Sequence, residues 1–378
     1  MAEKSMTILD LEGTPRQCGQ AHGEAMRDQI MEIREIFLEQ SGLPGVHELE
    51  AMCWQMFMQT GFLEAARRWT PDLAEEVEGI SDGAGIGRGF IWAFQHQDEM
   101  INLANDLSAR PTPEGSACTS LGSGPLDGSP AVVAQNLDTP AIYHGHQTLL
   151  KIRYRGRQDQ ALVVSEPGLV GICGLNSSGV GVCQNTLAWQ LNRSLRGVAA
   201  MLVARGLLHQ PNLEKAVGFL KTIPHASGIN YAVGGPEGVV DYECSPNQHV
   251  QFIPEDTPGR IYHTNHPLVN TDLYPADKLP QAGQEYYQRF IANTYTRFDA
   301  LRRRLAQISG PLTVSTIQDI LASHDSEDYP ICRHIRPELG KMGSCTNNTV
   351  IMELTSSPRM LLSSEPPCQH AYQEFGFR

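Results

Sequence analysis

The spacing of apolar residues changes near residue 118, and this change constrains the fold more than any other feature of the chain. Between about residues 18 and 103, apolar residues such as Leu49, Met52 and Met56 recur every three or four positions, which is typical of amphipathic helices. Beyond residue 118, residues such as Leu150 and Ile152 alternate with charged ones, which is typical of half-buried strands. We therefore expect a helical first third followed by a strand-rich remainder.

The same patterns give approximate bounds for the elements. We expect helices over residues 21–40, 47–69, 71–80, 89–105, 195–203, 213–223 and 282–306, with Ser194 as the N-cap of the fifth. We expect strands over residues 150–155, 169–175, 180–183, 229–233, 239–244, 250–253, 261–264, 348–354 and 359–363. Helices grouped between blocks of strands favour a layered α+β fold, with helices on the outer faces of two stacked sheets.

Composition narrows the classes of partner. The net charge is −13 and basic residues form no run, which argues against nucleic acid as a partner because phosphate binding needs clustered Lys and Arg. Neither a signal peptide nor 18 consecutive apolar residues occurs, so we expect no membrane partner and a cytoplasmic location. Nine cysteines without a CxxC pair fit reduced thiols. Small molecules remain as partners, and the sequence leaves homo-oligomers open.

Cys118 lies at the change of pattern and could become a new N-terminus. If the Ala117–Cys118 bond were cut, the freed α-amino group would lie next to its own thiol. A terminal amine titrates near ~7.7–8.0, against ~10.4 for lysine, so at neutral pH part of it can accept the thiol proton. The small residues before Cys118 leave the preceding carbonyl accessible, and we expect residues 107–115 to form an exposed loop that leads to this bond.

Asp138 is the first candidate partner of Cys118. It closes the strand expected after Cys118, and a hairpin turn through residues 124–128 would bring it back beside the cysteine, against the new ammonium group. The alternative is a strand-end carboxylate that caps a turn near Pro140.

Two later segments supply further candidates. The Asn265 amide can donate a hydrogen bond to a developing oxyanion, whereas His263 and His266 could instead ligate zinc, although no HExxH or CxxC pair accompanies them. Arg333 could clamp a carboxylate, or it could be an ordinary surface arginine. The glycine-rich segment 83–89 follows a helix and lacks the P-loop lysine, so we interpret it as a helix C-cap and turn.

Together these segments resemble motifs of the acyl-coenzyme A:isopenicillin N acyltransferase family, an autoproteolytic branch of the N-terminal-nucleophile hydrolases. The resemblance covers nearly the whole chain. Its motifs are EGTP at 12–15 with HG at 22–23, ACT at 117–119, QNLD at 135–138, GLNSSGV at 174–180, HTNH at 263–266 and YPICR at 329–333.

The resemblance implies one four-layer αββα sandwich over residues 1–378, which cuts itself into an α chain, 1–117, and a β chain, 118–378. It further implies that Cys118 is the nucleophile, that Asp138 and Arg333 position and tune the terminal amine, and that Asn265 helps to form the oxyanion hole. It implies no cofactor, and we assign no metal ligand. Two features depart from the fungal member that typifies this family: Ala117 stands where that member has Gly, which predicts slower processing, and the turn between Cys118 and Asp138 is longer.

The function predicted from these residues is that of a self-processed cysteine amidohydrolase, which cleaves the C–N bond of a small N-acyl compound through a thioester. An N-acyltransferase with an acyl-coenzyme A or amide donor is the nearest alternative, because the two share the acyl-enzyme. A binding protein that keeps the fold without chemistry is the third. Members of the family also remove β-alanyl and other acyl groups, so penicillin chemistry does not follow.

Overall fold

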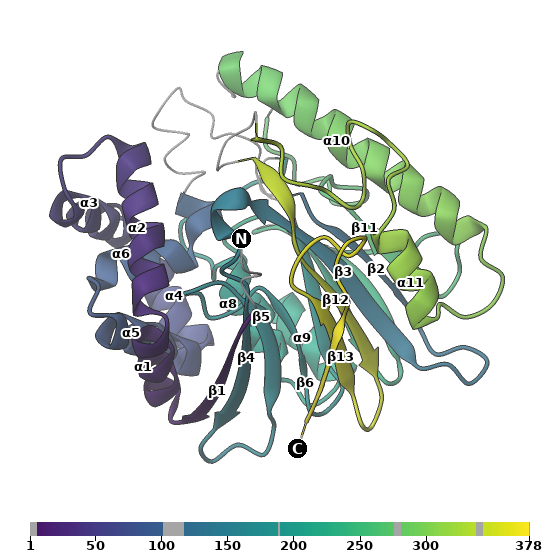
Figure 1. The fold of residues 1–378 in the computed structure, drawn as a ribbon, viewed down its shortest axis with the longest axis horizontal. Coiled ribbons are helices and arrows are strands. Elements are labelled where there is room, and N and C mark those ends of the chain that lie inside the picture. Colours follow the sequence, from purple (N-terminus) through teal and green to yellow (C-terminus); the bar gives the residue numbers. More distant parts are fainter. Residues whose placement is uncertain (1–5, 101–116, 188–189, 276–280, 338–342, 378) are drawn as a thin grey trace.

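The computed structural model describes residues 6–100, 117–187, 190–275, 281–337 and 343–377 (Figure 1). Its helices are α1 (Pro15–Ala25), α2 (Arg27–Ser41), α3 (Val46–Met58), α4 (Phe62–Trp69), α5 (Pro71–Ala84), α6 (Arg88–Gln95), α8 (Ala200–Leu207), α9 (Leu213–Thr222), α10 (Gln281–Ala306) and α11 (Val314–Leu321), with a 3-10 turn at Ala141–Tyr143. Its strands are β1 (Thr7–Gly13), β2 (Thr119–Ser123), β3 (Ala131–Pro140), β4 (Thr148–Tyr154), β5 (Ala161–Ser165), β6 (Cys173–Asn176), β7 (Gly181–Thr186), β8 (Ile229–Gly235), β9 (Gly238–Cys244), β10 (His249–Phe252), β11 (Arg260–His263), β12 (Ser344–Leu354), β13 (Arg359–Ser363) and β14 (Gln373–Gly376).

The strands form two sheets. The larger has the order β1-β4-β5-β6-β7-β8-β9-β10, and the smaller has the order β11-β2-β3-β12-β13-β14. Strands β1 and β4 pair in parallel, whereas β2, β3 and β12, which carry the candidate site, pair antiparallel. The α+β class predicted from the sequence is therefore confirmed.

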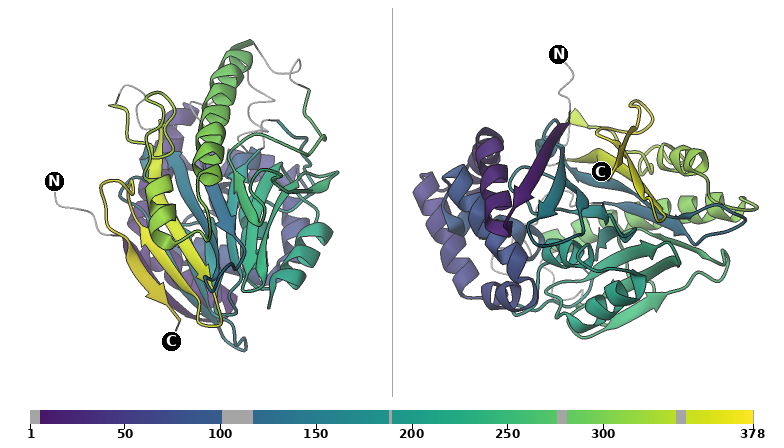
Figure 2. Two further views of the ribbon diagram at one scale, coloured as in Figure 1. Left: turned by 90° about the vertical axis from the view of Figure 1, so that its right-hand side faces the viewer. Right: turned by 90° about the horizontal axis from the view of Figure 1, so that it is seen from below.

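The two sheets stack face to face, and helices cover both outer faces (Figures 1 and 2). Strands β2 and β3 of the smaller sheet contact β7, β8 and β9 of the larger one. Helices α8 and α9 pack on the outer face of the larger sheet, and α10 and α11 pack on that of the smaller one. This arrangement is the predicted αββα sandwich.

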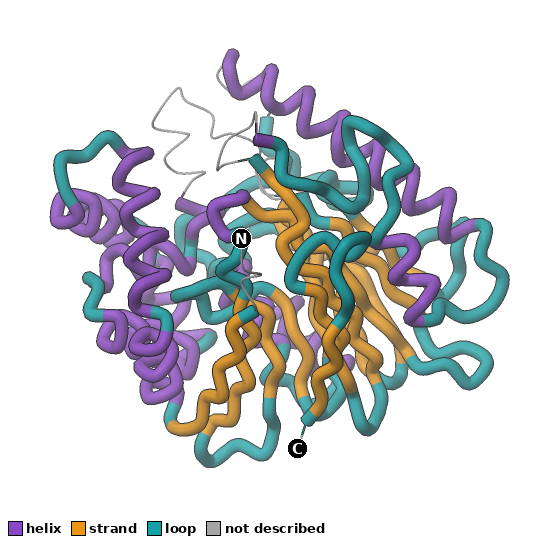
Figure 3. Tube along the Cα trace, viewed as in Figure 1, coloured by secondary structure: helices purple, strands orange, loops and turns teal. Residues whose placement is uncertain are grey.

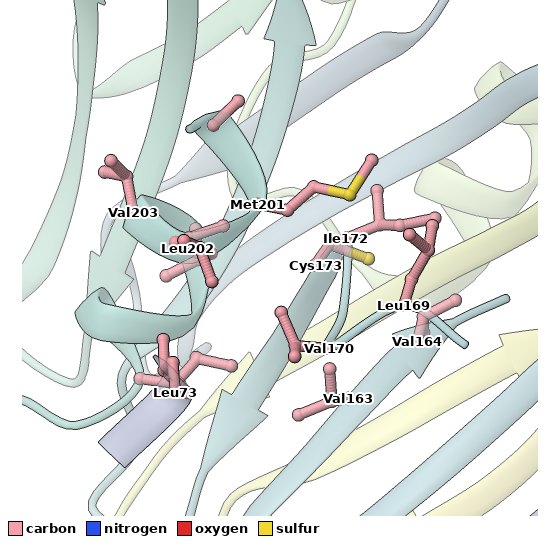
Figure 4. Close-up of a cluster of buried hydrophobic side chains, with 14 of the residues drawn as sticks. Leu73, Val163, Val164, Leu169, Val170, Ile172, Cys173, Met201, Leu202 and Val203 are labelled. Atoms are coloured by element: carbon pink, nitrogen blue, oxygen red, sulfur yellow. The ribbon is translucent and has the colours of Figure 1, made fainter. Parts of the chain in front are cut away.

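The remaining helices gather beside the larger sheet, at the left of the tube drawing (Figure 3). Helix α1 packs on β1, and α5 contacts α8. Where α5, α8 and the larger sheet meet, Leu73, Val163, Cys173 and Leu202 are buried in one apolar cluster (Figure 4). Burial of these apolar side chains stabilises the association of the helical third with the sandwich. Each Å² of apolar surface removed from water contributes roughly 25 cal/mol.

Strand β3 lies between two apolar layers, and its residues alternate between them. Val132 and Ala134 belong to the cluster under α10 and α11, whereas Ala131 and Val133 belong to the cluster shared with the larger sheet. This follows from the period of two in a strand. Both faces of the strand are therefore buried, and polar side chains at its end lie inside the protein.

Several predicted bounds need correction. The helix expected over 195–203 begins only at Ala200, because the preceding backbone is extended and pairs with residues 224–226: the Val198 N–H donates to the Pro224 carbonyl at 2.7 Å. The helix expected over 47–69 is two helices that break at Gly61, whose N–H donates to the Leu195 carbonyl at 2.7 Å. The helix expected over 21–40 likewise divides, at Met26. Hydrogen bonds to distant residues determine the first two of these helix boundaries. A local sequence pattern does not contain that information.

Other predictions are confirmed. The hairpin of β6 and β7 forms, the long helix α10 lies where it was expected, and Gly85 ends α5 in the left-handed conformation with φ of 66°. The predicted exposed loop 107–115 lies outside the described residues.

Within the part of the chain that the structure describes, none of the helices combines the length and the apolar character needed to cross a membrane.

Candidate active site

Cys118 immediately precedes β2, and the β2–β3 hairpin places it beside Asp138. Thr119 pairs with Asn136, and the Ala117 N–H donates to the Asp138 carbonyl at 3.0 Å, so Ala117 and Cys118 continue the same antiparallel ladder. Only 5% of Cys118 is exposed, and its side chain belongs to the core cluster between the sheets. The sequence-predicted neighbours Cys118 and Asp138 are thus brought together.

The Asp138 carboxylate is fully buried. Its Oδ1 accepts a hydrogen bond from the Thr346 hydroxyl at 2.6 Å, which is a contact across the sheet and not the cap of a turn at Pro140. Among the described residues its Oδ2 has no hydrogen-bond partner. Burial raises the pKa of Asp138 to about 6, against the opposing effects of Arg333, Arg297 and Thr346. The group is therefore ionised at neutral pH and can accept a proton in mildly acidic solution.

The Cys118 thiol is held in its neutral form in the uncut chain. Burial, followed by the charge of Asp138, raises the pKa of the thiol to about 12, while the Asp138 backbone and Arg297 act in the opposite direction. Because the thiolate is the nucleophile, attack from this position requires a group that accepts the proton.

Arg297 on α10 joins the parts of the site, and sequence reasoning missed it. Its Nη1 donates to the Cys118 carbonyl at 2.7 Å and to the Thr119 hydroxyl at 2.8 Å, its Nη2 donates to Asn265 Oδ1 at 2.9 Å, and its Nε donates to Asn293 Oδ1 at 2.8 Å. The guanidinium is fully buried, and burial lowers its pKa to about 10, so it stays charged at neutral pH.

A signal for Arg297 is present in the sequence. It occupies one position in a helical series of buried residues with spacings of three and four, namely Phe290, Thr294, Arg297, Leu301 and Leu305. An arginine on the apolar stripe of a helix needs buried acceptors, since burial of an unpartnered charge is costly. That spacing could have marked it as a site residue.

Asn265 lies just after β11 and is fixed by several hydrogen bonds. Its N–H donates to the Thr294 hydroxyl at 2.7 Å, its carbonyl accepts from Gln190 at 2.6 Å, and its Nδ2 donates to the Thr186 carbonyl at 3.2 Å. Because Arg297 donates to Oδ1, the amide is oriented with its nitrogen away from the guanidinium. Nδ2 makes this one hydrogen bond within the described ranges, so its second N–H can donate to a ligand.

The alternative zinc pair at His263 and His266 is not formed. The two ring nitrogens of His263 lie 2.9 Å from Glu243 Oε1 and 2.9 Å from the Thr264 carbonyl, so both face acceptors. His266 Nδ1 lies 3.0 Å from the Thr294 hydroxyl. His263 therefore offers no lone pair to a metal.

Arg333 is buried, not a surface arginine, with 6% of its surface exposed. The backbone N–H of Arg333 donates to the Thr346 hydroxyl at 2.9 Å, and the backbone carbonyl of Arg333 accepts from the Thr346 backbone N–H at 3.0 Å. The Thr346 hydroxyl in turn donates to Asp138. Its charge also lowers the pKa of Asp138, in opposition to burial. Cys118, Asp138, Asn265 and Arg333 thus lie in one network, which Thr346 and Arg297 complete.

Residues 127–344 match the family model described as Acyl-coenzyme A:6-aminopenicillanic acid acyl-transferase, and this range is more than half of the chain. The chain belongs to this acyltransferase family. A curated relative is the 40 kDa form of the acyl-coenzyme A:6-aminopenicillanic-acid-acyltransferase of Emericella nidulans, which is 24% identical over 337 residues and 87% of this chain. That match covers 85% of the relative. The resemblance predicted from the motifs is confirmed.

Two solved structures are similar at a lower level. The penicillin V acylase of Agrobacterium tumefaciens has a TM-score of 0.41 at 12% identity, with 65% of this chain and 83% of that chain covered. A variant of the conjugated bile acid hydrolase of Clostridium perfringens has a TM-score of 0.37 at 13% identity, with 69% and 97% covered. The acyltransferase family model begins at residue 127, after Cys118, so the nucleophile and the cleavage site stay predictions.

Proposed function

We propose that this member of the acyltransferase family is a self-cleaving cysteine amidohydrolase, which hydrolyses the C–N bond of a small N-acyl compound through a thioester. The observation that carries the proposal is the position of Cys118 directly before β2, where its carbonyl accepts a hydrogen bond from Arg297 and the Ala117 N–H donates one to the Asp138 carbonyl. This backbone is fixed on both sides of the bond to be cut.

Self-cleavage proceeds in two steps. Cys118 Sγ attacks the Ala117 carbonyl, the C–N bond to Cys118 breaks, and the acyl group is transferred to sulfur while the nitrogen leaves as an amine. Water then hydrolyses this thioester, which gives Ala117 a carboxylate and returns the thiol. The new amine at Cys118 titrates near ~7.7–8.0 when unperturbed and serves as the base for later turnovers.

Asp138 is the proposed proton acceptor in the first step, because the thiol is neutral and Oδ2 is buried with no hydrogen-bond partner in the part of the chain that the structure describes. With its pKa near 6, the cleavage rate should rise about tenfold per pH unit below that value and level off above it. The cleavage rate rises with pH because the carboxylate, and not the protonated acid, accepts the thiol proton. Cleavage of purified precursor, followed on gels between pH 4.5 and pH 9, measures the profile.

Asp138→Asn should cleave slowly, with a rate that rises with pH throughout, since only the rare thiolate then reacts. Asp241→Asn is the control, because Asp241 is also buried with a pKa raised to about 6 and also has one bonded and one unpartnered oxygen among the described residues, but it is not among the groups that shift the pKa of Cys118. If the Asp138 variant keeps the plateau, the proton goes elsewhere.

In turnover, the thiol of Cys118 attacks the substrate amide and Asn265 Nδ2 donates to the oxyanion that forms. Asn265→Ala should therefore lower kcat by roughly 10²–10³, the usual effect of one lost oxyanion donor, while the chain still folds and is at least partly cleaved. Asn192→Ala is the control, since Asn192 is a half-buried amide that bonds to Asp272. Turnover of the Asn265 variant near that of the control would remove Asn265 from the reaction.

The second candidate is an N-acyltransferase, which the description of the family favours. It forms the same thioester, and an amine instead of water resolves it. The measurement that separates the two is release of free amine from a panel of N-acyl amines, with and without added acyl-coenzyme A, with Cys118→Ala as the blank.

Release of amine without a second substrate supports hydrolysis. Acyl transfer that depends on acyl-coenzyme A, with no hydrolysis of any amide, would replace the proposal by the acyltransferase. A cleaved protein inert in both assays would favour the non-catalytic binding protein.

A further inference from the structure

Four side chains with nitrogen and sulfur donors converge outside the proposed catalytic site. They are His324, Cys332, His334 and Cys368, and their donor atoms all lie within 4.8 Å of one another. His324 Nε2 and His334 Nε2 are 3.0 Å apart, Cys332 Sγ and Cys368 Sγ are 3.6 Å apart, and Cys368 Sγ lies 3.4 Å from His334 Nε2. Three of them come from the segment that follows α11, and Cys368 comes from the segment that follows β13.

Three of the six separations among these donor atoms are close to the edges of a tetrahedron around one metal ion, and the other three are no longer than 4.8 Å. With Zn–S of about 2.3 Å and Zn–N of about 2.0–2.1 Å, ideal edges are about 3.8 Å between sulfurs, about 3.3 Å between nitrogens and about 3.6 Å from sulfur to nitrogen. The distances found are 3.6, 3.0 and 3.4 Å, each slightly shorter than the corresponding edge and in the same order. The four donor atoms are therefore close enough together to surround one small ion.

We propose that these four residues form a structural Cys₂His₂ site for Zn²⁺. Two thiolates and two imidazoles are a donor set that suits zinc, whereas magnesium and calcium prefer oxygen. Four protein ligands leave no open position for water or substrate, which is the arrangement of structural zinc sites. On binding, the two thiols lose their protons to solvent, both histidines bind as neutral rings, and no electron is transferred.

The ion would link two segments that pass close to the proposed catalytic site. Cys332 immediately precedes Arg333, and its N–H donates to the Ser323 carbonyl at 3.0 Å. The Ile331 carbonyl accepts from Asn136 of β3 at 3.0 Å. Zinc would therefore fix the loop that carries Arg333 against the segment after β13, at a place where the fold supplies no strand pairing between them.

The rival explanation is a disulfide between the two cysteines. Their sulfurs are 3.6 Å apart, whereas a disulfide needs about 2.05 Å. A disulfide also gives no reason for two histidines with facing Nε2 atoms beside the sulfur pair, whereas a metal ion explains all four.

The test is metal content of the full-length protein. It is stripped with a chelator under reducing conditions, reloaded with Zn²⁺, freed of excess metal and analysed by elemental mass spectrometry. We expect about one zinc per chain. Because loss of an outer partner of a metal ligand already lowers affinity by about 10–100-fold, His324→Ala and Cys368→Ser should each lower zinc affinity at least about tenfold.

Both variants alter exposed residues and should keep the fold. His47→Ala and Cys53→Ser are the matched controls, since both lie in the helical third and outside the cluster. Loading with Co²⁺ provides a spectroscopic check, because a tetrahedral site with two thiolates gives visible bands and sulfur-to-metal charge transfer that the two ligand variants should lose.

The proposal fails if wild-type protein binds no zinc, if the two ligand variants bind it as well as the controls do, or if Cys332 and Cys368 are recovered as a disulfide from protein purified under anaerobic conditions. Cys118→Ala should bind zinc like the wild type. Failure of the zinc site and failure of the catalytic proposal are therefore separate results.

Discussion

Purified protein is expected to consist of two fragments, residues 1–117 and 118–378, and Cys118→Ala is expected to remain a single chain. The reason is that the attacking sulfur and the carbonyl it attacks belong to adjacent residues, which the ladder to Asp138 and the bond from Arg297 hold in place. Without the sulfur, no acyl transfer occurs and the peptide bond persists. Intact-mass spectrometry and N-terminal sequencing measure both results.

Cys173→Ala is the matched control, since Cys173 is buried in the same core cluster and the change removes the same sulfur atom. It should cleave like the wild type, apart from a loss of folding stability of the order of 1 kcal/mol. A fully active enzyme with Met1 or Ala2 as its sole N-terminus would contradict the mechanism. Cleavage of Cys118→Ala at the same bond would do so as well, because it would point to an external protease.

The fold was largely predictable because its main signals are local. The change from helical to alternating spacing near residue 118 marks where the described strands other than β1 begin, and the turn at residues 124–128 fixes the hairpin that brings Asp138 to Cys118. The predicted strands do not include β1, whose parallel partner β4 lies far along the chain. Pairings of that kind leave no local pattern.

The candidate site was predictable where a residue lies near the end of a strand, and less so where it depends on distant contacts. Cys118 directly precedes β2, Asp138 lies near the end of β3 and Asn265 lies just after β11, and polar residues at such places stand out in the sequence. Arg297 lies inside a long polar helix, where an arginine is ordinary, and only its place on the apolar stripe of that helix distinguishes it. The Cys₂His₂ cluster joins a loop to a segment more than thirty residues later, so its four ligands do not form a short sequence motif that would indicate a metal site.

Arg297→Met is expected to have the second large effect. The change keeps an unbranched side chain but removes the hydrogen bonds that hold Asn265 Oδ1 and the Cys118 carbonyl. The Asn265 amide can then rotate, which withdraws the oxyanion donor, so kcat should fall by roughly 10²–10³ with little change in KM. The precursor should also cleave more slowly. Arg304→Met on the same helix is the control, because Arg304 is partly exposed and pairs with Asp325 at the surface.

A pH profile separates this role from a merely structural one. The charge of Arg297 lowers the pKa of Asp138 and partly offsets the effect of burial. Without that charge the Asp138 pKa should rise above about 6, and the acid limb of the self-cleavage profile should move to higher pH with it. Loss of packing alone would lower the rate at every pH and leave the midpoint unchanged. If the midpoint of Arg297→Met coincides with that of Arg304→Met while the rate falls, Arg297 acts through the fold and not through the charge of the site.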